Sequence, residues 1–114
     1  RSFVLQTGVS SDGVAAVLLK NTAEGRRPVA YASRTLSEQG KKYSVYELET
    51  LAMLFGTEKF RLCLEHSEFD LETNNQVLSW VLAKYSKTGH LARWAICISA
   101  FRFTVHQIRG VLRI

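Results

Sequence analysis

The sequence predicts a mixed α/β domain in which helices pack on the faces of a sheet. Three strand-like segments come first, at residues 2–7, 13–20 and 27–33, and short polar turns join them. A helical pattern begins at Ser44, and strand-like and helix-like segments follow it to the C-terminal end. Strands first, then a helix and further strands, favour an α+β or mixed α/β sheet.

The first three segments read as an antiparallel meander. "SFVLQT" alternates apolar and polar residues, "GVAAVLLK" is more continuously apolar, and "RPVAYAS" comes next. Asp12 before Gly13 is ordinary turn chemistry, and Asn21 and Gly25 supply it for the second connection. The segments are therefore expected to pair in sequence order.

A capping box predicts where the first helix begins. Ser44 is followed three residues later by Glu47, so each side chain can accept a hydrogen bond from the backbone N–H of the other residue. Apolar residues then recur at helical spacing, which predicts a helix through about Leu64. Its expected core stripe is Leu48, Leu51, Ala52, Phe55 and Leu62.

The rest of the chain predicts two more strands and two short helices. "FDLET" at residues 69–73 and "FRFTVHQI" at 101–108 alternate as strands, whereas 75–83 and 89–100 have helical patterns. Trp80 and Trp94 are interpreted as core anchors under these helices rather than as platforms for stacked bases. Five strands and their helices fit one domain spanning residues 1–114.

Composition excludes some classes of protein. No apolar run approaches the roughly 20 residues that cross a bilayer, and no leader segment is present, so a membrane partner is not expected. The chain lacks an initiator Met and looks like part of something longer. Cys63 and Cys97 lie in apolar stretches and are interpreted as reduced, buried thiols of an intracellular protein, cytoplasmic or nuclear.

One pair of residues has metal-ligand spacing. Cys63 and His66 form a C-x-x-H pair, for which Cys97, His90 or His106 are the remote partners available. No second closely spaced pair accompanies it, so a core thiol and a histidine near a helix end are the favoured interpretation. We expect no bound metal and no cofactor.

The charges are unevenly distributed along the chain. The net charge is +5, all ten acidic residues lie at or before Glu72, and the remainder carries only basic charges. These are Lys84, Lys87, Arg93, Arg102, Arg109 and Arg113. A basic surface of this kind is typical of nucleic-acid binding, but it also occurs as a simple solvated face.

Several motifs together resemble a known family. "FVLQT", "RPVAYASRTL", "YSVYELETLA" and "TGHLARW" are similar, in order and spacing, to motifs of the ribonuclease H domain of Ty3/gypsy-type retroelement polyproteins, which follows reverse transcriptase. The resemblance runs from Phe3 to about Ile108. It implies a ribonuclease H-like fold, with a five-stranded mixed sheet whose first three strands are antiparallel and with helices on its faces. The family's last helix, which carries its last aspartate, would follow Ile114, so we expect it to be missing from residues 1–114.

The resemblance also implies a site. Ribonucleases H cut the RNA strand of an RNA/DNA hybrid with two magnesium ions held by carboxylates. The family's first strand ends in Thr-Asp-Ala-Ser, but residues 7–10 place Gly8 at the aspartate position. The family's helix glutamate matches Glu49, and its Thr-Asp-His matches residues 73–75, with Asn74 at the aspartate position. Gly8, Glu49 and Asn74 are therefore vestigial site positions.

The expected function follows from this loss. Asp12 lies in a turn at a variable family position and is not expected to replace the missing aspartate. We expect a catalytically inactive, host-domesticated retroelement domain that binds a protein partner or forms a homodimer. The alternatives are a module that binds nucleic acid weakly, or a residual ribonuclease H. The residues for nucleic-acid binding are Lys84, Lys87, His90 and Arg93.

Overall fold

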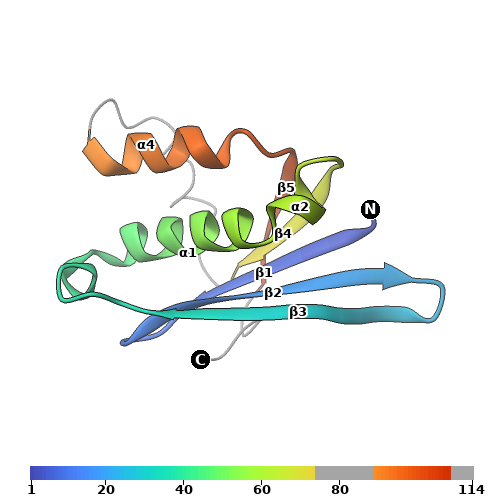
Figure 1. Cartoon of the computed structure of the whole chain (residues 1–114), viewed down its shortest axis with the longest axis horizontal. Helices are drawn as coiled ribbons and strands as arrows, with labels where there is room; N and C mark the ends of the chain where they lie inside the picture. Colours follow the sequence, from blue (N-terminus) through green and yellow to red (C-terminus); the bar gives the residue numbers. More distant parts are fainter. Residues whose placement is uncertain (74–88, 109–114) are drawn as a thin grey trace.

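The computed structural model describes residues 1–73 and 89–108, and five strands there form one mixed sheet in the order β3-β2-β1-β4-β5 (Figure 1). The strands are β1 (Phe3–Val9), β2 (Gly13–Thr22), β3 (Gly25–Thr35), β4 (Phe69–Thr73) and β5 (Phe103–Gln107). β1 is antiparallel to β2 and parallel to β4. The predicted five-stranded mixed sheet is confirmed.

The first three strands form the predicted antiparallel meander. β2 and β3 extend further than the pattern indicated, and the two residues between Thr22 and Gly25 connect them. Gly25 has a φ of 114°, a conformation that side chains with a Cβ atom rarely adopt. The other end of the meander closes where the backbone N–H of Leu36 donates to the carbonyl of Asp12 at 2.8 Å.

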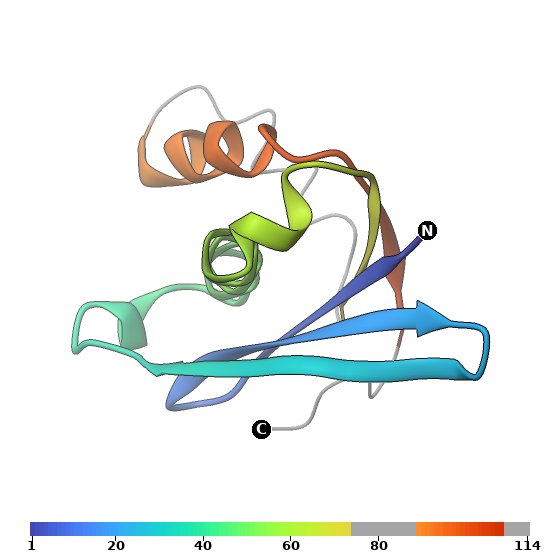
Figure 2. The same cartoon turned by 45° about the vertical axis from the view of Figure 1, so that its right-hand side comes forward.

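The described helices lie on one face of the sheet, as Figures 1 and 2 show. They are the 3₁₀ helix η1 (Gly40–Lys42), α1 (Val45–Lys59), the one-turn α2 (Arg61–Leu64) and α4 (Gly89–Ile98). α1 packs against β1 and β2, and α4 packs against α1. The predicted helix at 75–83, with Trp80, lies outside the described residues.

The predicted capping box is confirmed, but the predicted end of the helix is wrong. Ser44 Oγ accepts from the backbone N–H of Glu47 at 3.2 Å, and Glu47 Oε1 accepts from that of Ser44 at 2.9 Å. α1 ends at Lys59, and the next residue, Phe60, has a φ of −109° and a ψ of 28°, which are not helical. The chain turns there, so that Phe60 and Leu64 are buried, whereas Leu62 is 83% exposed and not part of the core.

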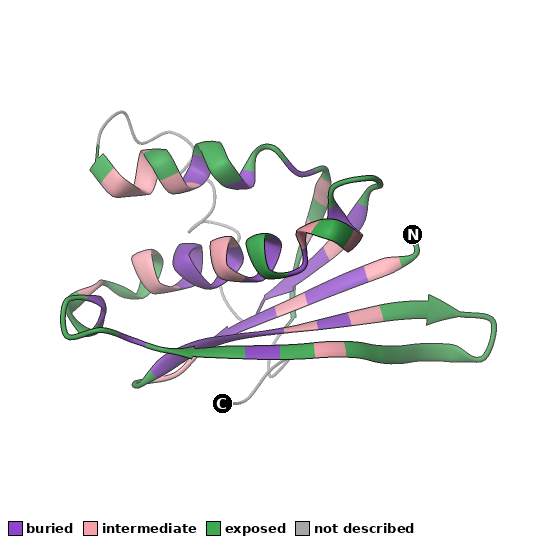
Figure 3. Ribbon diagram, viewed as in Figure 1, coloured by how far each residue is buried: buried purple, intermediate pink, exposed green. Residues whose placement is uncertain are grey.

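The apolar core lies between this helical layer and the sheet (Figure 3). Its largest cluster includes Leu5, Leu18, Met53, Phe69 and Ile98. α1 approaches the sheet closely at Gly56, where an added Cβ would lie 3.1 Å from the Cβ of Ala16.

The two cysteines and Trp94 were expected in the core, and the structure differs for the cysteines. Cys63 and Cys97 are both free thiols, but Cys97 is exposed and Cys63 only half-buried, so the prediction of two buried thiols is wrong. Cys97 follows Ile96 on the outer side of α4, while Ala95 and Ile98 take the inner side. Trp94 packs on the core as predicted, with its ring edge toward Tyr43. No helix in residues 1–73 and 89–108 is long and apolar enough to cross a membrane.

Candidate functional site

Gly8 lies near the end of β1, the central strand of the sheet. It is buried and pairs with Ala15 of β2. On the other side, Thr7 is level with Thr73, the last residue of β4. The C-terminal ends of β1 and β4 therefore lie side by side at one end of the sheet. Gly8 gives β1 no side chain there. Asn74, which follows Thr73, lies outside the described residues.

Glu49 lies on α1, which packs against β1 and β2. It lies in the first half of α1 and is buried, with 7% of its surface exposed. Its chain neighbour Leu48 belongs to the same apolar cluster as Val9, the neighbour of Gly8. Figure 1 shows the end of β1 and the first turns of α1 at one end of the sheet. The fold thus places Gly8 and Glu49 toward the same end of the sheet, and Glu49 alone of the two has a carboxylate.

Asp12 has a structural role in the turn that follows β1. Ser10 Oγ accepts hydrogen bonds from the backbone N–H groups of Asp12 and Gly13, at 3.2 and 3.1 Å. Asp12 itself is exposed. The turn predicted at this position is present, and its side-chain acceptor is Ser10.

Each of the three histidines contacts a different carboxylate. His66 contacts Glu65 at 3.4 Å, whereas His90 and His106 contact carboxylates on other elements. Over residues 1–73 and 89–108, no group of three or more His, Cys, Asp or Glu side chains is arranged to hold a metal ion.

His90 belongs to the contact between α4 and α1. Its Nε2 bonds Oε2 of Glu47, and its ring lies 5.2 Å from that of Tyr43 and 4.9 Å from that of Trp94, measured between centroids. The hydrogen bond from the backbone of Ser44, with help from His90, holds the pKa of Glu47 below its usual value despite partial burial. His90 is therefore engaged by a carboxylate and two aromatic rings.

The residues proposed for nucleic-acid binding are only partly placed. Arg93 is exposed on α4, three residues after His90. Lys84 and Lys87 lie outside the described residues. Of the four residues proposed for this role, the described part of the chain therefore places two: Arg93, which is exposed, and His90, which is bonded to Glu47.

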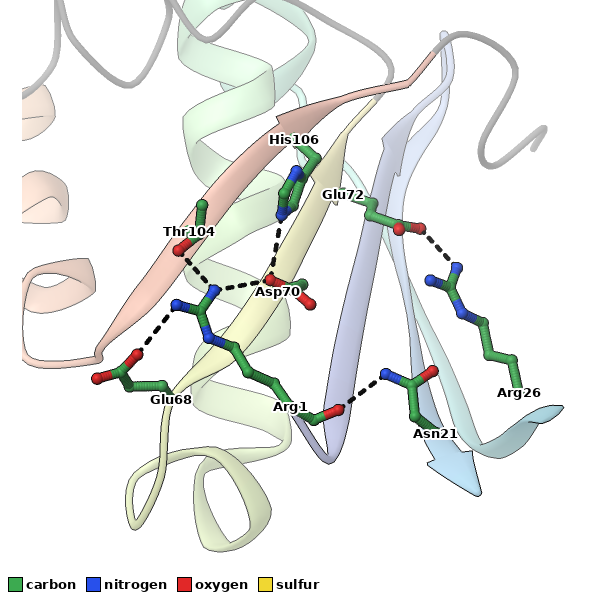
Figure 4. Close-up of polar contacts among 8 residues, drawn as sticks. All are labelled: Arg1, Asn21, Arg26, Glu68, Asp70, Glu72, Thr104 and His106. Atoms are coloured by element: carbon green, nitrogen blue, oxygen red, sulfur yellow. Dashed lines mark hydrogen bonds and ion pairs between the residues drawn. The ribbon is translucent and has the colours of Figure 1, made fainter. Parts of the chain in front are cut away.

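A polar cluster covers β4 and β5 on the face opposite α1 (Figure 4). Arg1 contacts Asp70 at 2.9 Å and Glu68 at 3.1 Å, and His106 Nε2 lies 3.1 Å from Asp70. Partial burial raises the pKa of Asp70, but the hydrogen bonds and charges of His106 and Arg1 outweigh it, so the pKa is lowered. The cluster ties the start of β1 to β4 and β5.

Glu72 forms a second contact on this face. It is buried, its Oε1 accepts from Gln6 at 2.9 Å, and Arg26 approaches it at 3.0 Å (Figure 4). The sequence analysis missed both polar contacts. The alternation in residues 69–73 already placed Asp70 and Glu72 on one face, but their partners are 36 to 69 residues away in the chain.

Comparison with known proteins identifies relatives along almost the whole chain. The family model described as the RNase H-like domain found in reverse transcriptase matches residues 1–101. The Pol polyprotein of transposon 297 from Drosophila melanogaster is 32% identical over 110 residues, which are 96% of this chain and 10% of that protein. The Pol polyprotein of Drosophila transposon 412 is 26% identical, again over 96% of this chain and 9% of that protein. The chain thus spans about a tenth of the length of these relatives.

Solved structures support the same fold. The foamy viral protease-reverse transcriptase in complex with double-stranded DNA matches 99% of this chain and 24% of its own, with a TM-score of 0.76 and 16% identity. RNase H1 from Halobacterium salinarum matches 95% of this chain and 84% of its own, with a TM-score of 0.58 and 13% identity. At such identities, the likeness concerns the fold alone.

Proposed function

Because this chain belongs to the family of RNase H-like domains found in reverse transcriptase, we propose that it is a catalytically inactive member, kept as a protein-interaction or homodimerisation module. One observation carries the proposal: Gly8, the last residue but one of β1, pairs with Ala15 of β2 and follows the Thr7–Thr73 pair with β4, and the Ty3/gypsy-type motif has an aspartate at this position.

Electrostatics explains why this position matters. Magnesium is a hard cation, and two such ions close together need several carboxylates to offset their charge. Of the three matched positions, Gly8 has no side chain, Asn74 has a neutral amide, and Glu49 alone can be ionised. A single carboxylate is a poor basis for two magnesium ions, so we expect no hybrid cleavage.

The rest of the domain supports retention for another use. The capping box of α1, the close approach at Gly56 and the apolar core between α1 and the sheet are all in place. A decaying copy is not under selection, so it loses core residues as readily as site residues. Most such core changes destabilise the fold. Loss confined to the site is the pattern expected of a domain of Ty3/gypsy origin that a host gene has taken over. Such a protein acts inside the cell.

Nucleic-acid binding is the second candidate. The absence of acidic residues after Glu72 favours it, because phosphates attract a basic surface. The bond between His90 and Glu47 argues against nucleic-acid binding, because a carboxylate already occupies one of the four side chains proposed to contact phosphate. We therefore place protein interaction first and weak hybrid or RNA binding second.

A cleavage assay tests the loss of activity. The purified protein is incubated with a labelled RNA/DNA hybrid and magnesium or manganese, and the RNA is expected to remain intact. The control is Glu49→Ala, which removes the one carboxylate of the matched positions. Cleavage by the unaltered protein above this control overturns the proposal of an inactive domain. Restoring Gly8→Asp and Asn74→Asp together is expected to give at most weak cleavage.

Light scattering over a range of protein and salt concentrations tests the interaction role. We expect a dimer, or a stable complex with a protein partner, that persists as salt rises. Phosphate binding weakens steeply with salt, whereas an apolar interface does not. A strict monomer at high concentration, together with tight hybrid binding that collapses with salt, reverses the order of the two candidates.

A further inference from the structure

β3 lies at one edge of the sheet, with β2 as its strand partner. It is 11 residues long, and nearly all of it is exposed. One side of its backbone therefore has no strand partner within the described sheet. Pro28, which lacks an N–H, and the charges of Arg26 and Arg27 protect the hairpin end from pairing. Residues 30–35 have no proline and offer N–H and C=O groups to another strand.

An apolar groove follows this part of the edge on the side of α1. A hollow of about 340 Å³ is lined by Arg34 of β3 and by Leu51, Leu54 and Phe55 of α1. A second hollow of about 230 Å³ shares Arg34, Leu51 and Leu54, and Trp94 closes it. Because side chains alternate along a strand, a strand added to β3 would place every second side chain over this groove.

The rim of the groove is positively charged. Glu58 also lines it, but its carboxylate contacts Arg61 at 2.7 Å on the next helix. Arg34 and Lys59 form no ion pair with any residue in the described ranges 1–73 and 89–108. Two cations thus flank an apolar floor, and the nearest acid is already bonded. This charge pattern is complementary to an acidic ligand.

We propose that the edge of β3 and the adjoining groove bind an extended segment of a partner protein that has both apolar and acidic residues on the face turned toward α1. The segment adds a strand to β3 through backbone hydrogen bonds. Every second side chain then lies over the groove, where the apolar ones pack on Leu51 and Leu54 and the carboxylates face Arg34 and Lys59. This inference rests on the proposed interaction role and names the surface and the chemistry of the partner.

The test uses a fluorescein-labelled peptide of ten residues in which threonine occupies every second position and the positions between are leucine and glutamate in turn, so that leucines and glutamates share one face of the strand. Its anisotropy is titrated with the whole domain, and binding is expected to shift the amide resonances of residues 30–35. Arg34→Glu and Lys59→Glu each reverse one charge at the groove and should weaken binding at least about fivefold. Arg102→Glu makes the same charge change next to β5, far along the sheet from β3, and should change the affinity less than about twofold.

Two further peptides separate strand addition from simple charge attraction. A peptide with lysine in place of glutamate has the wrong charge, and one with every second backbone amide N-methylated cannot complete the ladder. Both should bind at least about tenfold more weakly than the parent peptide. No binding at about 1 mM peptide, or equal losses from Arg34→Glu and Arg102→Glu, overturns the inference.

The outcome is distinguishable from failure of the proposed function. If the peptide does not bind but the domain is inactive and associates in light scattering, the interaction role stands and this surface is wrong. If a hybrid duplex shifts the same resonances and displaces the peptide, with loss of binding at high salt, the groove is a phosphate-binding surface and the inference is overturned.

Discussion

His90 on α4 bonds Glu47 in the first turn of α1. Glu47 therefore both caps α1 and holds α4 against it. Glu47 is an acceptor in its ionised form, and Nε2 of His90 therefore carries the proton of this bond. The rings of His90, Tyr43 and Trp94 each contact the other two. The contact joins the segment before α1 to both helices.

We predict that His90 and Glu47 are energetically coupled. His90→Ala removes the hydrogen bond and the ring contacts, and Glu47→Gln weakens the acceptor. In a double-mutant cycle measured by urea unfolding, the coupling free energy should be about 1 kcal/mol and stabilising. His66→Ala, at an exposed histidine, is the control and should change stability by less than about 0.5 kcal/mol. Strict additivity of the two changes contradicts the prediction.

The second prediction concerns acid stability and Asp70. Its folded-state pKa is lowered, so its contribution to the free energy of unfolding is present above the ordinary aspartate pKa of about 3.9. This contribution is lost as the pH falls through the lowered value, because the unfolded state then binds the proton more readily. Asp70→Asn should have a lower free energy of unfolding than the unaltered protein at neutral pH. On acidification, the free energy of unfolding of the variant should fall by less than that of the unaltered protein, as measured by urea unfolding at a series of pH values.

Asp12→Asn is the matched control for this experiment, because it removes an exposed carboxylate from a turn. It should leave the pH dependence nearly unchanged. An Asp70→Asn profile parallel to that of the unaltered protein would show that the contacts with His106 and Arg1 do not contribute to folding.

The third prediction tests the revised end of the first helix. Leu64 is fully buried and Leu62 is 83% exposed, although the helical pattern placed Leu62 in the core. Leu64→Ala should cost about 3 kcal/mol of unfolding free energy, since it empties a buried site. Leu62→Ala should cost less than about 0.5 kcal/mol. Equal losses from the two changes, measured by urea unfolding, contradict the structure at α2.

The elements that local chemistry determines were predictable from the sequence. Alternation predicted the strands of the meander, and the spacing of Ser44 and Glu47 predicted the start of α1. The break at Phe60 was not predictable, because "FRLCL" continues a helical pattern and only packing of Phe60 and Leu64 on the core ends it. Local pattern is a weak guide where tertiary contacts decide.

The candidate site was predictable only in part, for a similar reason. Gly8 and Glu49 were identified by matching motifs, and the fold brings them to one end of the sheet. The partners of Glu47 and Asp70 were missed, because His90 and His106 are 43 and 36 residues further along the chain. Such contacts depend on the parallel pairing of β4 with β5 and on the docking of α4, and neither leaves a local pattern.

The last prediction concerns Gly56, where α1 lies close against β1 and β2. A Cβ there would lie 3.1 Å from Ala16 Cβ and 3.2 Å from Leu5 Cδ2, and both residues are fully buried. Gly56→Leu forces these groups apart and should destabilise the domain by about 3 kcal/mol. Gly56→Ala combines a tight contact with a gain in helix propensity of about 1 kcal/mol and should change stability little. All variants are compared by urea unfolding, with Lys59→Leu as the control because Lys59 is exposed on the same helix. If Gly56→Leu lowers the free energy of unfolding no more than Lys59→Leu does, α1 does not pack this closely on β1 and β2.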